Sequence, residues 1–122
     1  MGHEHTDIKK RVIEILKNIY DPEIPINIYD LGLIYRVDVK NSDVEIDLTL
    51  TSMGCPLALI LPRYIEEEIR SKLPEVREVK VNLVFNPPWT PLKMTEEGRK
   101  RFKELYGYDI VEEWIRTHRE RT

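Results

Sequence analysis

The apolar residues of this chain recur at two spacings that alternate along the sequence. Steps of three and four residues predict α-helices, whereas alternation with polar residues predicts half-buried strands. The helical spacing covers residues 7–20, 56–73 and 95–106, and it resumes after residue 109. The alternating spacing covers residues 33–40, 44–51 and 79–85. We expect residues 1–6, which precede the first pattern, to form a flexible tail.

The order of these elements predicts the fold class. Helix, strand, strand, helix, strand, helix, helix is typical of an α/β (α+β) two-layer sandwich, in which a small mixed sheet of about three strands carries helices on one face. The turn at residues 41–43 joins the first two strands as an antiparallel hairpin. Because a helix separates this hairpin from the third strand, we expect that strand to pair in parallel with an earlier one. Residues 7–106 are predicted to form the domain, and residues 107–122 a C-terminal helical extension.

The only cysteine, Cys55, stands between Gly54 and a proline, at the predicted start of the second helix. Proline is favoured at the first helical position, and the N–H groups and dipole of a helix N-terminus favour an anion. A thiol in this place tends to have a lowered pKa, and its thiolate attacks electrophiles or binds metals. The alternative is a small buried hydrophobe in a strand-to-helix turn. The hydroxyls of Thr51 and Ser52 would hydrogen-bond the thiolate or an anion near it, or only satisfy the backbone of the turn.

Two proline-containing loops carry further candidates. Residues 21–35 combine two prolines with several acids, and they hold too many apolar side chains for a solvated linker. Packed loops that carry acids are frequent places of function. The alternative is that Asp21 caps a turn and that Glu23 is a solvated charge. In the second loop, residues 86–94, we expect Trp89 to cover the edge of the core, or else to line the cysteine turn or contact a partner.

Composition and charge narrow the classes of function. The chain has 122 residues, 41% of them apolar, and a net charge of −3 without a basic stripe, so nucleic-acid binding is not indicated. One cysteine cannot form an internal disulfide, and it cannot by itself supply the four thiolates that usually hold an iron–sulfur cluster. No apolar run approaches the ~20 residues of a membrane span, and no signal-peptide pattern is present. We therefore expect a cytoplasmic protein that binds no membrane.

Enzyme chemistry has little support in the motifs. The chain lacks CxxC, HExxH and a glycine-rich phosphate loop. A thiol-dependent enzyme would need a base for Cys55, and the sequence offers only carboxylates or the distant His118. His3 and His5 would be able to bind a metal, but two histidines near a chain end are more often incidental.

Three sequence blocks together resemble the MIP18 family, also called DUF59, which contains the SufT-type iron–sulfur cluster assembly proteins. The blocks are DPEIPINIYDLGLIY at 21–35, LTLTSMGCPLALI at 48–60 and NPPWTPLKMTEEGR at 86–99. The resemblance covers about residues 7 to 106. It implies a cytosolic factor that helps to mature iron–sulfur proteins, often as an adaptor between scaffold and target.

The resemblance also assigns roles to particular residues. The family cysteine corresponds to Cys55, the loop acids to Asp21 and Glu23, and the conserved DLGL turn to the segment that begins at Asp30. The family's hydroxyl pair corresponds to Thr51 and Ser52, where many relatives have two threonines. The cysteine-rich zinc segment of phenylacetate-pathway relatives and the P-loop domain of the scaffold ATPases are both absent, which favours a SufT-like protein consisting of this domain alone.

Three hypotheses of function follow. In the first, the Cys55 thiolate transiently handles iron, sulfur or a cluster, with Asp21 or Glu23 as additional hard oxygen ligands and no stably bound cofactor. Its partners would be iron–sulfur scaffold or target proteins, and a homodimer would supply two thiolates. In the second, the protein is an interaction adaptor without metal chemistry that uses the acidic loop and Trp89. In the third, it is a thiol-dependent enzyme.

Overall fold

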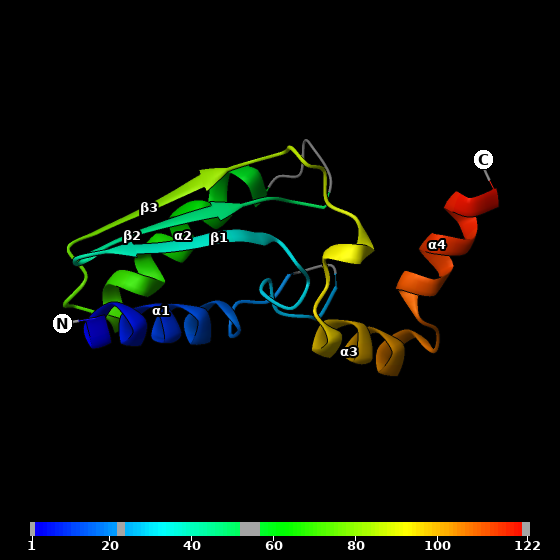
Figure 1. Cartoon of the computed structure of the whole chain (residues 1–122), viewed down its shortest axis with the longest axis horizontal. Helices are drawn as coiled ribbons and strands as arrows, with labels where there is room; N and C mark the ends of the chain where they lie inside the picture. The colour runs from blue at the N-terminus through cyan, green and yellow to red at the C-terminus, as the bar shows by residue number, and fades with distance from the viewer. Residues whose placement is uncertain (1, 22–23, 52–56, 121–122) are drawn as a thin grey trace.

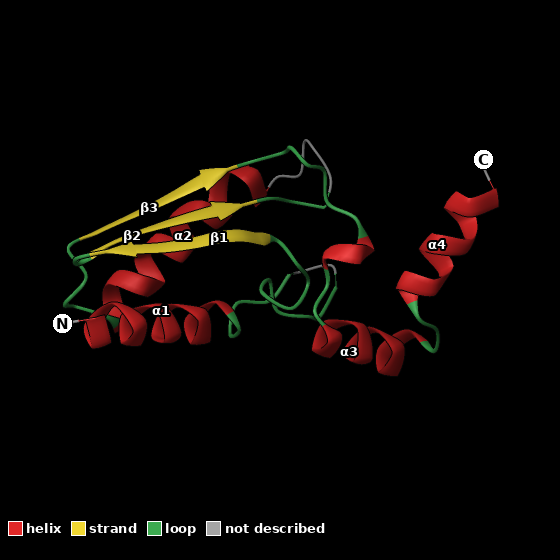
Figure 2. Cartoon of the chain, viewed as in Figure 1, coloured by secondary structure: helices red, strands yellow, loops and turns green. Residues whose placement is uncertain are grey.

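The computed structural model describes residues 2–21, 24–51 and 57–120 of the chain. Its elements follow the predicted order (Figures 1 and 2). They are α1 (Gly2–Leu16), β1 (Ile34–Lys40), β2 (Asp43–Leu48), α2 (Leu57–Lys72), β3 (Glu78–Leu83), the short 3₁₀ helix η1 (Pro91–Lys93), α3 (Glu96–Tyr106) and α4 (Ile110–Glu120). The fold is α+β, as predicted.

The first helix is displaced relative to its predicted bounds. It begins at Gly2, so the backbone of residues 2–6 continues the helix instead of forming the predicted tail. No proline interrupts this stretch, and its internal residues do not break a helix. At the other end, Asn18 and Ile19 donate to carbonyls only three residues back, at 3.0 and 3.2 Å. This tighter turn ends the α-helix at Leu16, four residues before the predicted Tyr20.

The sheet has the strand order β1-β2-β3, with β1 antiparallel and β3 parallel to β2. Both pairings match the prediction. Helices α1 and α2 cover one face, and the core lies between them and the inward side chains of the strands (Figure 1). The opposite face is charged and open. Helix α2 starts behind the end of β3 and runs back toward the hairpin, so its N-terminus lies at the edge where β2 and β3 end (Figure 1).

A β-bulge at Tyr35 changes which side chains of β1 point toward the core, so the alternation predicted for this strand is wrong at its start. Ile34 pairs with Leu48 and Arg36 pairs with Asp47, so two steps along β1 correspond to one step along β2. Ile34 therefore packs against the core, although simple alternation placed it on the polar face. The extra residue, Tyr35, extends instead toward the second proline loop and donates its hydroxyl to the carbonyl of Pro87 at 2.8 Å.

Helices α3 and α4 lie beyond the end of the sheet (Figure 2). Thr95 caps α3 by accepting from the N–H of Gly98 at 3.1 Å, and the helix ends at Gly107 in the left-handed conformation. Asp109 then caps α4 through the N–H of Val111 at 2.9 Å, and it pairs with Arg99 of α3 at the same distance. Helix α4 contacts α3 and η1, so the C-terminal extension packs on its own chain. Nowhere in the described part of the chain is a helix both long and apolar enough to cross a membrane.

Candidate functional site

The turn at residues 27–32 is bonded to the segment that starts α3. One carboxylate oxygen of Asp30 accepts from the hydroxyl of Thr95 at 2.7 Å, and the other accepts from the side-chain amide of Asn27 at 2.8 Å. The carbonyl of Asp30 accepts from the N–H of Thr95 at 3.0 Å. One carboxylate oxygen and the carbonyl of Asp30 thus hold two distant loop segments together, while the other carboxylate oxygen braces the turn itself. This is a structural use for a residue that the sequence offered as a binding residue.

Two glycines allow these segments to approach. Gly32 has a φ of +86°, and a Cβ there would lie 2.3 Å from the carbonyl oxygen of Lys93. A Cβ on Gly98 would lie 2.2 Å from the carbonyl oxygen of Asp30. Neither position has room for a side chain, because the obstacle in each case is backbone. The glycines of the first and third sequence blocks therefore permit the contact between those blocks.

Trp89 completes this link. Its indole N–H donates to the carbonyl of Leu31 at 2.8 Å, and its ring packs against the core. This is the first of the roles that the sequence offered for Trp89, a cover for the edge of the core. The loop at 86–94 is consequently fixed over the loop at 21–35.

A second cluster lies where β2 ends. The hydroxyl of Thr49 is fully buried and has no hydrogen-bond partner in the described part of the chain. It lies near the phenol of Tyr35, whose pKa is raised by burial. The ammonium of Lys93 lies 5.1 Å from the centre of the Tyr35 ring. Neither Thr49 nor Tyr35 was singled out from the sequence. Alternation along the strand places Thr49 on the polar side with Thr51, whereas the Thr49 side chain is fully buried and Thr51 is exposed.

Asp21 occupies a turn and also faces a groove. Its carboxylate accepts from the N–H of Ile24 at 3.0 Å, as the turn-capping alternative predicts. The groove has a volume of about 390 Å³ and lies between the end of α1 and the start of α2. It is lined by Asn18, Ile19, Tyr20, Asp21, Ile28, Ile60, Leu61 and Tyr64.

Two side chains of this groove differ from their predicted burial. The helical spacing of α2 placed Ile60 and Tyr64 in its buried stripe, yet they are 61% and 47% exposed. Leu61, Ile65 and Ile69, on the adjacent side of the helix, are the ones that are buried. Ile60 and Tyr64 lie at the margin of the stripe, four residues apart on one helical face.

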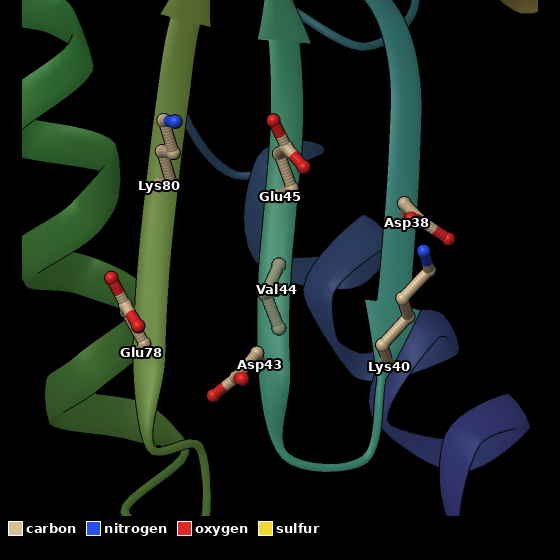
Figure 3. Close-up of a pocket in the computed structure, with 7 residues that line it drawn as sticks. All are labelled: Asp38, Lys40, Asp43, Val44, Glu45, Glu78 and Lys80. Carbon is tan, nitrogen blue, oxygen red and sulfur yellow. The ribbon is translucent and has the colours of Figure 1, made fainter.

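The outer face of the sheet is charged and largely self-neutralised. The guanidinium of Arg36 donates to Asp47 at 2.9 Å and pairs with Glu45 at 3.3 Å, while Asn82 donates to both acids. Arg36 and then Asn82 lower the pKa of Asp47. A shallow hollow of about 230 Å³ lies next to this network. Figure 3 shows the acids and lysines that line it, interspersed along the three strands. Opposite charges on neighbouring strands suit a solvated sheet face, and we assign no site to it.

Of the remaining predicted residues, Thr51 alone lies in the part of the chain that the structure describes. Thr51 is exposed and directly follows the end of the buried strand segment. Glu23, Ser52, Gly54 and Cys55 lie outside the described residues. Considering only the described side chains, no group of three or more His, Cys, Asp or Glu is placed to hold a metal ion.

Three segments nevertheless meet at one end of the sheet, the edge at which β2 and β3 end and β1 begins. Leu48, the last residue of β2, pairs with Ile34 at the start of β1 and with Leu83 at the end of β3. The loop at 21–35 enters β1 there, the second sequence block leaves β2 there, and the third block follows β3 (Figure 1). The carboxyl ends of parallel strands are where α/β proteins commonly bind ligands. The three blocks that are separate in sequence are therefore neighbours in the fold.

Comparison with known proteins agrees with this arrangement. A family model described as iron–sulfur cluster assembly protein matches residues 9–83. An Fe–S protein maturation auxiliary factor from Porphyromonas gingivalis is 41% identical over 102 residues, which cover 80% of this chain and 93% of that protein. The Fe–S protein maturation auxiliary factor SufT from Staphylococcus aureus is 43% identical over 84 residues, which cover 66% of this chain and 92% of that protein.

A solved structure shares the architecture. A DUF59 domain of unknown function from Bacillus anthracis superposes with a TM-score of 0.75 at 30% identity, covering 83% of this chain and 96% of the other. The fold, with its three loop segments meeting at one end of the sheet, is thus that of a small α+β domain of the DUF59 type. The chain belongs to the iron–sulfur cluster assembly protein family, the MIP18 or DUF59 family that its three blocks resemble.

Proposed function

We propose that this protein is a maturation factor for iron–sulfur proteins and that its working group is the thiolate of Cys55. The observation that carries the proposal is the convergence of the three family blocks at the edge formed by Leu48, Ile34 and Leu83. Cys55 lies in the middle block, two residues before the first residue of α2. A helix of 16 residues has the full set of N-terminal N–H groups and a dipole that favours an anion.

The chemistry follows from the properties of a thiolate. A thiolate is a soft ligand for iron in clusters, and a carboxylate is a harder oxygen ligand. In the proposal Cys55 holds iron, sulfur or a cluster transiently as cargo, and Asp21 or Glu23 supplies an oxygen ligand. Thr51 and Ser52 donate hydrogen bonds that stabilise the anion. The protein binds an iron–sulfur scaffold or target protein while the cargo passes, and a second copy of the chain would supply a second thiolate.

The groove at Asp21 supports a second candidate, an adaptor that brings scaffold and target together without handling metal. Its exposed Ile60 and Tyr64 are typical of a surface that contacts another protein. The two functions predict opposite results when Cys55 is replaced, because an adaptor needs only its contact surface.

Maturation of a target protein distinguishes them. Cells or a reconstituted system that depends on this protein would be supplied with wild type, Cys55→Ser or Cys55→Ala, and the activity of an iron–sulfur target would be measured. We expect both variants to fold and to lose target maturation. Serine approximates the size of cysteine but is a poor iron ligand, so an active Cys55→Ser variant would favour the adaptor.

A further inference from the structure

The groove between α1 and α2 has apolar walls that nothing in the described chain covers. Its floor consists of Ile19, Ile28 and Leu61, which are between 0% and 7% exposed. Its rim carries Tyr20 and Ile60, which are 59% and 61% exposed, so two large apolar side chains face solvent at one opening. A volume of about 390 Å³ lies within the ~300–1,000 Å³ of typical binding pockets. Apolar surface gathered at a concavity, rather than scattered singly, indicates a contact site.

The described residues that line the groove include one charged side chain. It is Asp21, which is half-buried. The hydroxyl of Tyr64 donates to Glu68 at 3.3 Å, and this carboxylate raises the pKa of the phenol. Glu68 is itself paired with Lys72 at 3.6 Å. The ammonium of Lys17, the residue after α1, lies over the ring of Tyr29 at 5.3 Å from its centre.

The rim also offers two phenol rings to a cation. Tyr20 and Tyr64 are both about half exposed, and the face of a phenol ring attracts an ammonium or guanidinium group. A lysine or arginine entering beside Asp21 would meet a carboxylate and an aromatic ring together. An aliphatic side chain entering next to it would cover Ile60 and reach the apolar floor. The chemistry of the groove therefore matches a segment that carries both kinds of side chain.

We propose that this groove binds a segment of a partner protein that presents one or two aliphatic side chains followed by a lysine or arginine. An amphipathic helix presents such side chains on one face, at positions three and four residues apart. Binding of a helix in an apolar groove is a recurring mode of recognition. The inference rests on the proposed function in one respect: Ile60 lies five residues after Cys55, so the bound partner is the protein that exchanges cargo with Cys55. The carboxylate of Asp21 favours a basic segment over an acidic one.

Two synthetic peptides test this binding without knowledge of the natural partner. Both are amphipathic helices about three turns long with leucine on one face; one carries lysine and the other glutamate on its polar face. Each is titrated into the full chain while the methyl signals of Ile60 and Ile115 and the ring signals of Tyr64 are followed by NMR. We expect the lysine peptide to shift the Ile60 and Tyr64 signals saturably, to leave Ile115 unchanged, and to lose affinity as salt is added.

Three variants sharpen the test. Ile60→Asp should weaken binding of the lysine peptide about tenfold or more, because the buried aliphatic contact is worth about 1.5–3 kcal/mol. Ile115→Asp makes the same change in charge at an isoleucine that is 38% exposed on α4, and it should bind like wild type. Asp21→Asn keeps an oxygen that accepts from Ile24 while removing the charge, so it should weaken binding and reduce the salt dependence. Thermal denaturation of each variant establishes that it is folded.

Several results would overturn the inference. They are equal binding of the glutamate peptide, equal binding by Ile60→Asp and wild type, or no binding at all. A dimer of the wild-type chain in sedimentation that Ile60→Asp abolishes would mean that a second copy occupies the groove, and would also overturn it. Cys55→Ser should bind the lysine peptide like wild type, so a failure of the proposed cysteine chemistry is separable from a failure of the groove.

Discussion

The indole N–H of Trp89 donates a hydrogen bond to the backbone carbonyl of Leu31, 58 residues earlier in the chain, at 2.8 Å. This bond fastens the loop after β3 to the loop before β1, next to the bonds between Asp30 and Thr95. The edge at which the three family blocks meet is thus held by bonds between loops as well as by the sheet.

Replacing Trp89 by phenylalanine removes this donor while keeping an aromatic ring against the core. The carbonyl of Leu31 loses its partner, and we expect the free energy of unfolding to fall by about 1 kcal/mol. Denaturant unfolding measures this change. Trp114→Phe on α4 is the matched control, since that indole stacks on His118 at 3.9 Å between ring centres. An equal loss in both variants would mean that the bond to Leu31 contributes nothing specific.

Substituting Gly32 by alanine separates steric conflict from backbone strain. Gly32 and Gly107 have nearly the same φ, +86° and +83°, but an added Cβ meets the backbone of Lys93 at Gly32 and nothing at Gly107. Gly107→Ala should cost about 1–2 kcal/mol for the left-handed conformation alone. Gly32→Ala should cost at least about 2 kcal/mol more, because loop backbone has to move. Equal destabilisation in thermal denaturation would show that the two loops do not need to be in close contact.

Thr49 presents a buried hydroxyl that stability measurements can evaluate. Valine has nearly the same shape, so Thr49→Val removes a buried hydroxyl that has no hydrogen-bond partner among the described residues, and it should stabilise the fold by about 1 kcal/mol. Denaturant unfolding of the variant and the wild type measures the change. A loss of stability in Thr49→Val, with Thr49→Ser retaining wild-type stability, would mean that the hydroxyl has a partner.

The network at Arg36 makes the fold sensitive to acid. Arg36 and Asn82 lower the pKa of Asp47 below its ordinary value of 3.8, so Asp47 stabilises the fold above that value and this stabilisation is lost as pH falls through the lowered pKa. Asp47→Asn should therefore flatten the decrease in stability below about pH 4. Asp38→Asn, which removes a longer contact to Arg36 at 3.4 Å, should alter the decrease less. Melting temperatures measured down to strongly acidic pH provide the comparison. An unchanged profile for Asp47→Asn would contradict the role of this network.

The sequence predicted the elements well because their hydrophobic periods are long and regular. The antiparallel hairpin and the parallel third strand both follow from such periods and from the crossover helix. The bulge at Tyr35 was missed, because one inserted residue changes the facing of Ile34 without changing the composition of the strand. The end of α1 was missed because Ile19 keeps the helical spacing although the last turn is a tighter one.

The candidate site was predictable in part. The loop acids, the pattern around Cys55 and Trp89 marked three segments that belong to the family resemblance, and the family model agrees with that resemblance. The roles assigned to Cys55 and the loop acids stay predictions. The link between Asp30 and Thr95 was not predictable, because nothing local records a hydrogen bond across 65 residues. Ile60 was assigned to the core because a helical stripe has no sharp margin in sequence, and its exposure depends on how α1 and α2 pack.

Cluster formation tests whether Cys55 handles iron or a cluster. Wild type and Cys55→Ser would be incubated side by side with ferrous iron and sulfide without oxygen, while visible absorption and elution volume on a sizing column are recorded. We expect a coloured species in the wild type, held by thiolates and eluting as a dimer, and none in Cys55→Ser. Colour that persists without Cys55, or a colourless wild-type protein, would contradict the assignment of iron or cluster handling to this residue.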